Sequence, residues 1–333
     1  DFSLTSSESE FYYCYQLNGD ACINQLECQW YDDGYGSGYC GGDGYYGDNG
    51  IIIAEGNTEN RIRFTSGQPI AEDGDWDGIT LNGNGNILRY VDYEYANREL
   101  QVYNGTGFVF EYSTISNLPL NTSGLYIEDN SDSLKINHNH FDVSGSYSVI
   151  AQYSDFSTFN NNVIDGTSQY AFDVANSSYS EFSNNIFNKF YEYAIYARSS
   201  HHMTFNNNYF IFEREGDWKR GIDIDSNTSG QGHKNNSIYN NTFVSSDECL
   251  TEYCQMEALV VMDAEVYDNT IDFSVRSDCD SWARGIYSDR SNIYNNTVFI
   301  QDLSTCNGAW QTGILAWGGN DNNRSSIYNN TVT

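Results

Sequence analysis

Two acidic residues could do acid–base chemistry if they face outward on neighbouring repeats. A pattern of Gly or Ala followed by apolar–x–apolar recurs along the chain, and its third residue should point away from the core, because side chains alternate along a strand. This outward position is occupied in turn by Asp173, Tyr196, Asp223, Val260, Tyr287 and Leu315. Asp173 and Asp223 are expected two repeats apart, roughly 9 to 10 Å, near the upper end of the range for inverting glycosidases. Asp225, His201, His202 and His233 are nearby in sequence.

A second candidate site is a calcium loop. Asp73, Asp75 and Asp77 have the D-x-D-x-D-G spacing of such loops, but the twelfth position is Asn84 instead of Glu, so the bidentate ligand is missing. The segment also fits a strand of the first coils. We therefore expect no cofactor, with structural Ca²⁺ at these three aspartates as the alternative.

Both candidates belong to a chain with one internal repeat, apolar–x–x–Asn–x–apolar. Its asparagines are Asn139, Asn162, Asn185, Asn208, Asn241, Asn269, Asn296 and Asn330. The first four are 23 residues apart, and later spacings grow to 34, which indicates loops inserted into a constant coil. Two earlier copies have Val91 and Ser113 instead, so we expect the ladder to begin after the first coils. Short alternating strands at this period predict an all-β, right-handed parallel β-helix with ten or more coils, roughly 50 Å long.

The repeated asparagine has a physical role at a corner. An inward amide can bond the backbone there and the same residue one coil away, at a spacing of ~4.8 Å, and so form a ladder. Just before it, a column of tyrosines is expected to face outward: Tyr239, Tyr267, Tyr294 and Tyr328. These rings are interpreted either as an ordinary exposed stack or as a stripe for sugar stacking or lateral packing. A shared Trp-x-x-Gly-Ile frame also aligns Arg220, Glu257 and Arg284 as a ladder of alternating charge.

The cysteines and the N-terminal composition suggest two parts. Residues 1–49, rich in Cys, Tyr and Gly, are expected to form a small disulfide cap, and residues 50–333 the β-helix. The cap holds Cys14, Cys22, Cys28 and Cys40, for which three pairings are open. In the solenoid, Cys279 and Cys306 each follow their ladder asparagine by ten residues, so we predict that they pair, as do Cys249 and Cys254.

Disulfides and sequons favour an extracellular or cell-surface location. Nine N-x-S/T sequons predict N-linked glycans, at Asn104, Asn121, Asn176, Asn227, Asn235, Asn240, Asn295, Asn323 and Asn329. The chain begins at Asp1, which we interpret as the result of signal-peptide removal. No apolar run is long enough to span a membrane. With 15 basic and 46 acidic residues, the net charge of -31 argues against nucleic acid as a partner.

Three further segments carry a resemblance to a known family. The order Phe64-Thr-Ser, Trp76-x-Gly-Ile and Leu88-x-Tyr-Val, followed by the Asn-Asn-Thr coils, resembles the pectate-lyase-like β-helix superfamily, most closely the CASH-type repeats of archaeal and bacterial surface proteins. This likeness covers residues 50 to 333. It implies the fold, whereas the superfamily includes both enzymes and non-catalytic proteins. The Asn-Thr-Asp, Gly-His-Gly and Arg-Ile-Lys motifs of polygalacturonases are absent from the sequence.

The function expected from these patterns is structural. We predict an extracellular surface protein without a catalytic site, either a filament or sheath subunit that stacks head to tail on copies of itself, or an adhesin stalk. Surface polysaccharide is a further expected partner. The alternative is a glycoside hydrolase, a lyase or a sugar-binding module that uses the Asp173, Tyr196 and Asp223 face.

Overall fold

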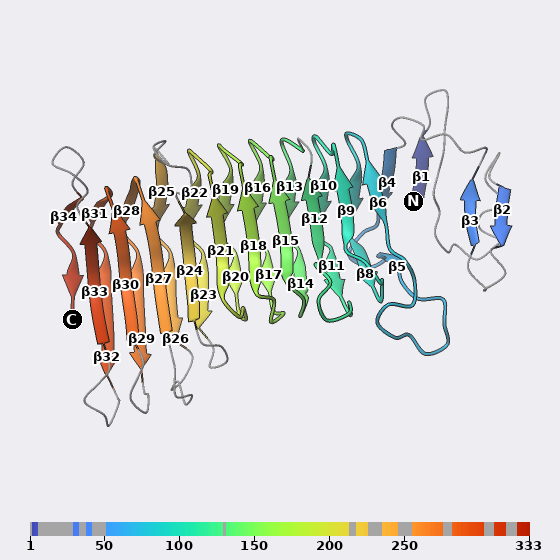
Figure 1. The fold of residues 1–333 in the computed structure, drawn as a ribbon. Coiled ribbons are helices and arrows are strands. Elements are labelled where there is room, and N and C mark those ends of the chain that lie inside the picture. Colours follow the sequence, from blue (N-terminus) through green and yellow to red (C-terminus); the bar gives the residue numbers. More distant parts are fainter. Residues whose placement is uncertain are drawn as a thin grey trace.

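The computed structural model is an all-β solenoid in which successive turns each add a strand to three long sheets (Figure 1). It describes residues 2–5, 29–32, 38–41, 51–128, 131–212, 218–225, 235–245, 255–275, 282–302, 310–317 and 325–333. The predicted right-handed parallel β-helix is confirmed. Within these ranges no helix is long and apolar enough to cross a membrane.

We call the three sheets I, II and III, in the order in which each turn visits them. Sheet I contains β1 (Phe2–Thr5), β4 (Ile51–Glu55), β7 (Ile87–Arg89), β10 (Val109–Glu111), β13 (Lys135–Asn137), β16 (Thr158–Asn160), β19 (Glu181–Ser183), β22 (Thr204–Asn206), β25 (Asn236–Tyr239), β28 (Ala264–Tyr267), β31 (Asn292–Tyr294) and β34 (Ser326–Tyr328). Sheet II contains β5 (Ile62–Phe64), β8 (Val91–Glu94), β11 (Thr114–Ser116), β14 (His140–Asp142), β17 (Val163–Ile164), β20 (Ile186–Phe187), β23 (Tyr209–Phe212), β26 (Thr242–Ser245), β29 (Thr270–Val275), β32 (Thr297–Asp302) and β35 (Thr331–Val332). Sheet III contains β6 (Thr80–Asn82), β9 (Leu100–Tyr103), β12 (Leu125–Glu128), β15 (Tyr147–Gln152), β18 (Tyr170–Ala175), β21 (Tyr193–Arg198), β24 (Trp218–Asp225), β27 (Gln255–Met262), β30 (Trp282–Asp289) and β33 (Trp310–Trp317).

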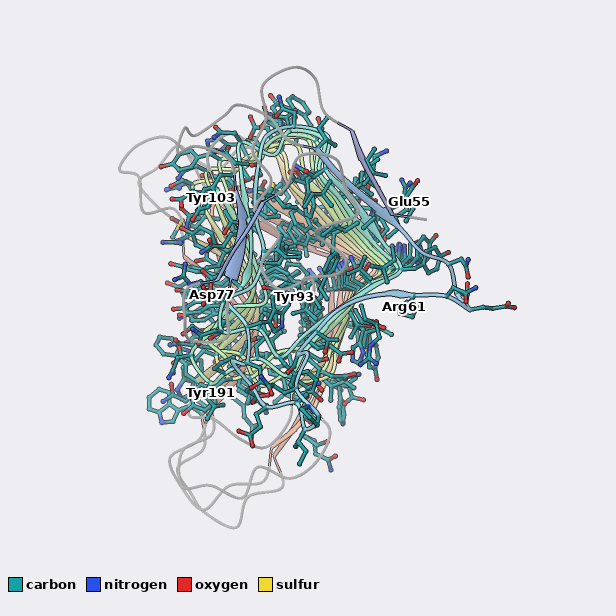
Figure 2. All side chains as sticks on the ribbon, turned by 90° about the vertical axis from the view of Figure 1, so that its right-hand side faces the viewer. Glu55, Arg61, Asp77, Tyr93, Tyr103 and Tyr191 are labelled. Atoms are coloured by element: carbon teal, nitrogen blue, oxygen red, sulfur yellow. The ribbon has the colours of Figure 1, made fainter. Side chains whose placement is uncertain are left out.

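The core runs along the axis and is filled by the inward residues of the three sheets. Equivalent residues stack from turn to turn, as where the ring of Phe182 lies 4.5 Å from Phe159 and 5.3 Å from Phe205. Figure 2, a view turned by 90°, shows Tyr93 inside the coil and Glu55 and Tyr103 pointing outward on opposite sides. In-register parallel pairing makes each inward position a column. A polar residue misplaced in such a column would therefore disturb the packing of two neighbouring turns.

The corner from sheet I to sheet II is made by two residues. The first has a left-handed backbone, as at Asn184 (φ 56°), and the second, Asn185 in that turn, points inward and is buried. Asparagine tolerates the left-handed region better than most residues, which accounts for Asn-Asn pairs at this corner. Eight turns carry the inward asparagine, so the regular part of the solenoid is slightly shorter than the ten or more coils predicted.

The N-terminal region adds short antiparallel strands. β1 pairs antiparallel with β4 and so lies along the first edge of sheet I. β2 (Gln29–Asp32) and β3 (Gly38–Gly41) form a separate hairpin. The division into a cap of residues 1–49 and a β-helix of residues 50–333 stays a prediction.

Candidate functional site: the outer face of sheet III

The outward column expected to carry chemistry lies on sheet III. Parallel register pairs Asp173 with Tyr196 and Tyr196 with Asp223, and continues through Val260, Tyr287 and Leu315. Both aspartates lie on the outer face but are at most 3% exposed. Two turns separate them, which corresponds to about 10 Å.

Asp173 is held by an arginine that the sequence did not single out. The guanidinium of Arg198 donates from Nη2 to Oδ2 (2.7 Å) and from Nε to Oδ1 (3.2 Å). Burial raises the pKa of Asp173 above its usual range, and the charge and hydrogen bonds of Arg198 oppose that rise. This bidentate pair joins two turns, since Arg198 lies beside Ala175 in the next column.

Asp223 belongs to a longer network of charges. Arg220 pairs with Asp223 in its own strand and donates to Glu257 Oε2 in the next turn (2.7 Å). Glu257, which is buried, also accepts from Arg284 one turn further on (2.7 Å). Arg220, Glu257 and Arg284 thus form the ladder of alternating charge that the Trp-x-x-Gly-Ile alignment predicts.

Aromatic rings flank this ladder. The guanidinium of Arg220 lies 4.1 Å from the ring of Trp218, and that of Arg284 lies 4.6 Å from the ring of Trp282. The indole N–H of Trp218 also donates to Glu257 (3.2 Å). Such cation–π contacts strengthen charge pairs that are partly removed from water.

These contacts decide what the face can do chemically. A glycosidase needs one carboxyl to give a proton and another to act as base or nucleophile. Asp173, Asp223 and Glu257 are instead each bound to a guanidinium, which occupies their oxygens. His202 lies elsewhere, stacked on Tyr179 at the corner from sheet III to sheet I (4.6 Å). His233 and the side chain of Asp225 lie outside the described residues. The arrangement is therefore better suited to holding neighbouring turns together than to acid–base catalysis.

The eight ladder asparagines form one column at the corner from sheet I to sheet II. In each rung, the side-chain carbonyl accepts from the backbone N–H and the amide of the preceding rung, as Asn162 does from Asn139 (3.0 and 3.2 Å). The same contacts connect Asn162, Asn185, Asn208, Asn241, Asn269, Asn296 and Asn330. Ser113 adds an earlier rung, because its hydroxyl accepts from Val91 N (3.0 Å) and its N–H donates to Asn139 (2.9 Å).

A second set of rungs at the corner from sheet III to sheet I was missed in the sequence. Ser154 N donates to the hydroxyl of Ser177 (3.0 Å), and Ser177 N to that of Ser200 (3.1 Å). A parallel column runs through Ser157 and Ser180 (3.0 Å). Their regular spacing of 23 residues is the signal that could have identified them.

The tyrosine column is a continuous face-to-face stack. Tyr239, Tyr267, Tyr294 and Tyr328 have ring centroids 5.0 to 5.1 Å apart and nearly parallel planes. Sugar rings bind aromatic side chains through the ring face, and here the inner faces are covered by neighbouring tyrosines. This geometry favours the interpretation as an exposed aromatic stack over that as a sugar-stacking stripe.

The aspartates of the possible calcium loop lie beside the first turns. Asp75 accepts from the Ser66 hydroxyl (2.5 Å) and from the Glu72 backbone N–H (2.9 Å), and these bonds lower the pKa of its carboxyl. Trp76 packs edge-on against Tyr93 in the core. Among the described residues, no three His, Cys, Asp or Glu side chains are grouped as metal ligands. Calcium binding by Asp73, Asp75 and Asp77 stays a prediction.

Several predicted residues fall outside the described part of the chain. These are Asn227 and Asn323 among the sequons, and Cys14, Cys22, Cys28, Cys249, Cys254, Cys279 and Cys306 among the cysteines. Cys40 lies in β3, but its side chain is not described. The disulfide pairings therefore stay predictions.

Three sheets that follow one another in every turn, with ladders of identical side chains at the corners, define a right-handed parallel β-helix protein. The family model described as a right-handed β-helix region matches residues 77–243, half of the chain, and the chain belongs to this family.

Several solved structures are similar to this chain at low identity. The A-module of mannuronan C-5 epimerase AlgE6 from Azotobacter vinelandii is 9% identical, with 82% of this chain and 89% of that chain covered and a TM-score of 0.40. DFA-IIIase from Arthrobacter chlorophenolicus A6 without its lid is 11% identical, with coverages of 79% and 91% and a TM-score of 0.40. A family 28 exopolygalacturonase from Yersinia enterocolitica is 10% identical, with coverages of 82% and 72% and a TM-score of 0.38. Likenesses at this level carry no argument about activity. No curated protein matches the chain.

Proposed function

We propose that the chain is a structural part of an extracellular surface protein, a rod that stacks end to end on copies of itself in a filament or sheath, or that serves as the stalk of an adhesin. The observation that carries this proposal is the pairing of the sheet III acids with arginines of the same face. Where an enzyme of this shape would need reactive carboxyls, this chain has ion pairs, most of which join neighbouring turns.

Other arginines along the rod also form ion pairs between neighbouring turns. Arg61 and Arg63 pair with Asp92 and Glu94, and Arg290 pairs with Asp263, all between consecutive turns. A chain with a net charge of -31 repels itself, so placing its few cations between turns offsets that repulsion along the axis. Rigidity along the axis is the property that a stalk or filament subunit requires.

In the turn formed by residues 325–333, two apolar side chains of the inward columns are partly exposed. Ile327 is 48% exposed and Val332 is 53% exposed, whereas their counterparts one turn earlier, Ile293 and Val298, are fully buried. At the opposite end, β5 and β6 each pair with a single strand in the described chain. We propose that β35 and β33 of one copy pair with β5 and β6 of the next.

Electron microscopy and sedimentation of the purified protein test this assembly. We expect rods whose length grows with protein concentration, and we expect the double variant Ile327→Asp and Val332→Asp to remain as single rods. The control is Ser326→Asp, because Ser326 lies on β34 of the same turn in a column of outward residues and should leave assembly intact. Single rods of the unchanged protein at every concentration would contradict end-to-end stacking.

The second candidate function is a sugar-binding module or carbohydrate-active enzyme on sheet III. It is supported by the exposed indoles of Trp218 and Trp310, which lie in one column beside the charge ladder. A polysaccharide screen separates the two functions. Cleavage that is lost in Asp223→Asn while the fold is retained would replace the structural proposal, whereas the structural proposal expects no cleavage by either protein.

A further inference from the structure

The sequons share one structural setting. Seven of them lie in the described part of the chain, and in all seven the asparagine is exposed, has a left-handed backbone and lies between two sheets instead of within a strand. They are Asn104, Asn121, Asn176, Asn235, Asn240, Asn295 and Asn329, with φ between 50° and 80°. Because the chain turns at each of these points, the side chain is directed away from the rod.

Most of these amides are also free to react. Among the described residues, the side chains of Asn121, Asn176, Asn240, Asn295 and Asn329 have no hydrogen-bond partner. The other two have one long contact each, from Asn104 to Asn82 (3.2 Å) and between Asn235 and His202 (3.5 Å). The ladder asparagines next to several of them are, in contrast, buried and fully bonded.

The fold explains the asparagines but not the whole sequon. A left-handed corner favours Asn, and the ladder requires a second Asn, which together give the first two residues of Asn-Asn-Thr. The third position is not fixed, because Val163, Ile186 and Tyr209 occupy it in three other turns. Among the described residues, seven of the 11 left-handed asparagines are followed two residues later by Ser or Thr, whereas this holds for four of the 13 other left-handed residues that are not Gly. Ser and Thr thus accompany Asn at these corners more often than they accompany other residues.

We propose that these seven corner asparagines carry N-linked glycans, and that Asn295 and Asn329 carry one glycan between them. In the reaction, Nδ2 of the asparagine attacks C1 of an oligosaccharide that a lipid phosphate carries, with an oligosaccharyltransferase as catalyst. The N–C bond forms, the C1–O bond to phosphate breaks, the amide loses one proton and the lipid phosphate leaves. The donor is thus a lipid-linked oligosaccharide, and the glycans would follow the corners and leave the sheet faces open.

The register of sheet I explains why Asn295 and Asn329 would carry only one glycan between them. Tyr294 pairs with Tyr328, so the two asparagines that follow them lie in one column on adjacent turns. Adjacent turns are ~4.8 Å apart, about the distance between stacked tyrosine rings, which leaves too little room for two bulky glycans. Asn240 has more room, because the next turn has Asp268 in the same column and Asn295 comes two turns later.

Site-by-site mass spectrometry of the secreted protein, after enzymatic glycan release in heavy-oxygen water, measures the occupancy of each asparagine. The variants replace the third residue of a sequon, Thr297→Val or Thr331→Val, which keeps the corner asparagine and the shape of a β-branched strand residue. If both sites compete for one glycan equally, Thr297→Val raises the occupancy of Asn329 roughly twofold, and Thr331→Val does the same for Asn295. The control Thr242→Val removes the glycan at Asn240 only.

Two results would overturn the proposal. One is an unmodified amide at all seven sites in protein secreted by its native cells. The other is molecules that carry glycans on both Asn295 and Asn329 as often as two independent sites would, with no response to Thr297→Val. Neither result depends on whether the rods assemble.

Discussion

The side-chain amide of Asn185 donates to the side-chain carbonyl of Asn208 one turn further along the rod, at 2.9 Å. The same carbonyl accepts the backbone N–H of Asn185 (3.0 Å), and the amide of Asn185 also donates to Phe159 O in the preceding turn (2.7 Å). Each rung therefore satisfies buried backbone groups in other turns, which is why the corner can be narrow without leaving polar groups unpaired.

Truncation of one rung should be costly. Asn185→Ala leaves the N–H of Asn162 and the carbonyl of Phe159 without their partners, and we expect the free energy of unfolding to fall by about 3 kcal/mol. The matched control is Asn184→Ala at the adjacent exposed corner position, where only the left-handed backbone is disfavoured, at about 1 kcal/mol. Denaturant unfolding of both variants measures the difference. Equal losses would mean that the ladder contributes little to stability.

Much of this corner could be predicted from the sequence because the period of the repeat is constant. Copies 23 residues apart place Asn162, Asn185 and Asn208 in one column, and the alternation of apolar residues sets which side faces the core. The serine rungs were harder to foresee, since serine is common in loops for many reasons. By residue type Ser113 breaks the asparagine column, although its hydroxyl serves as a shorter rung.

The pair of Arg198 and Asp173 should make stability depend on pH. Burial raises the pKa of Asp173 in the native state, so between the unfolded and native pKa values the native state binds more protons. Stability from this group is therefore full at low pH and is lost as pH rises through the native pKa. Arg198→Met removes the opposing charge, which raises that pKa further and makes the total loss of stability larger.

Unfolding curves over a pH series measure this coupling. We expect wild type and Arg198→Met to differ little at about pH 3, where Asp173 is protonated in both states, and to differ by about 2 kcal/mol at neutral pH. A control is Arg63→Met, whose partly exposed pair with Glu94 should contribute less than about 1 kcal/mol. A difference between wild type and Arg198→Met that is the same at every pH would exclude Asp173 as its origin.

This ion pair shows where reasoning from sequence stops. The register of the repeat places Tyr196 directly beside Asp173, and that placement is observed. The arginine that binds the carboxylate comes from the neighbouring column, two residues further along β21, and reaches it diagonally. Which long side chain crosses a column depends on rotamers and local packing. For that reason, the sequence indicated an exposed carboxylate pair where the structure has buried ion pairs.

Neighbouring turns approach each other so closely at Gly166 that a larger residue does not fit there. A Cβ added at Gly166 would lie 1.9 Å from Val143 O, and this backbone atom cannot move without disturbing the adjacent turn. Gly166→Ala should lower the free energy of unfolding by about 3 kcal/mol. Gly67→Ala is the control, because no atom lies within 4 Å of the added carbon there. Thermal melting of the two variants tests this, and similar melting temperatures would show that the turns are less tightly packed than described.

The proposed role of the sheet III acids in holding turns together is tested most directly at Glu257. Glu257→Gln removes a buried charge that accepts from both Arg220 and Arg284. Denaturant unfolding should show a loss of about 3 kcal/mol relative to Glu59→Gln, an exposed carboxylate on the loop after β4. That loss would show that the charge ladder of Arg220, Glu257 and Arg284 holds neighbouring turns together. Unchanged stability in Glu257→Gln would contradict the proposed structural role of the acids on this face.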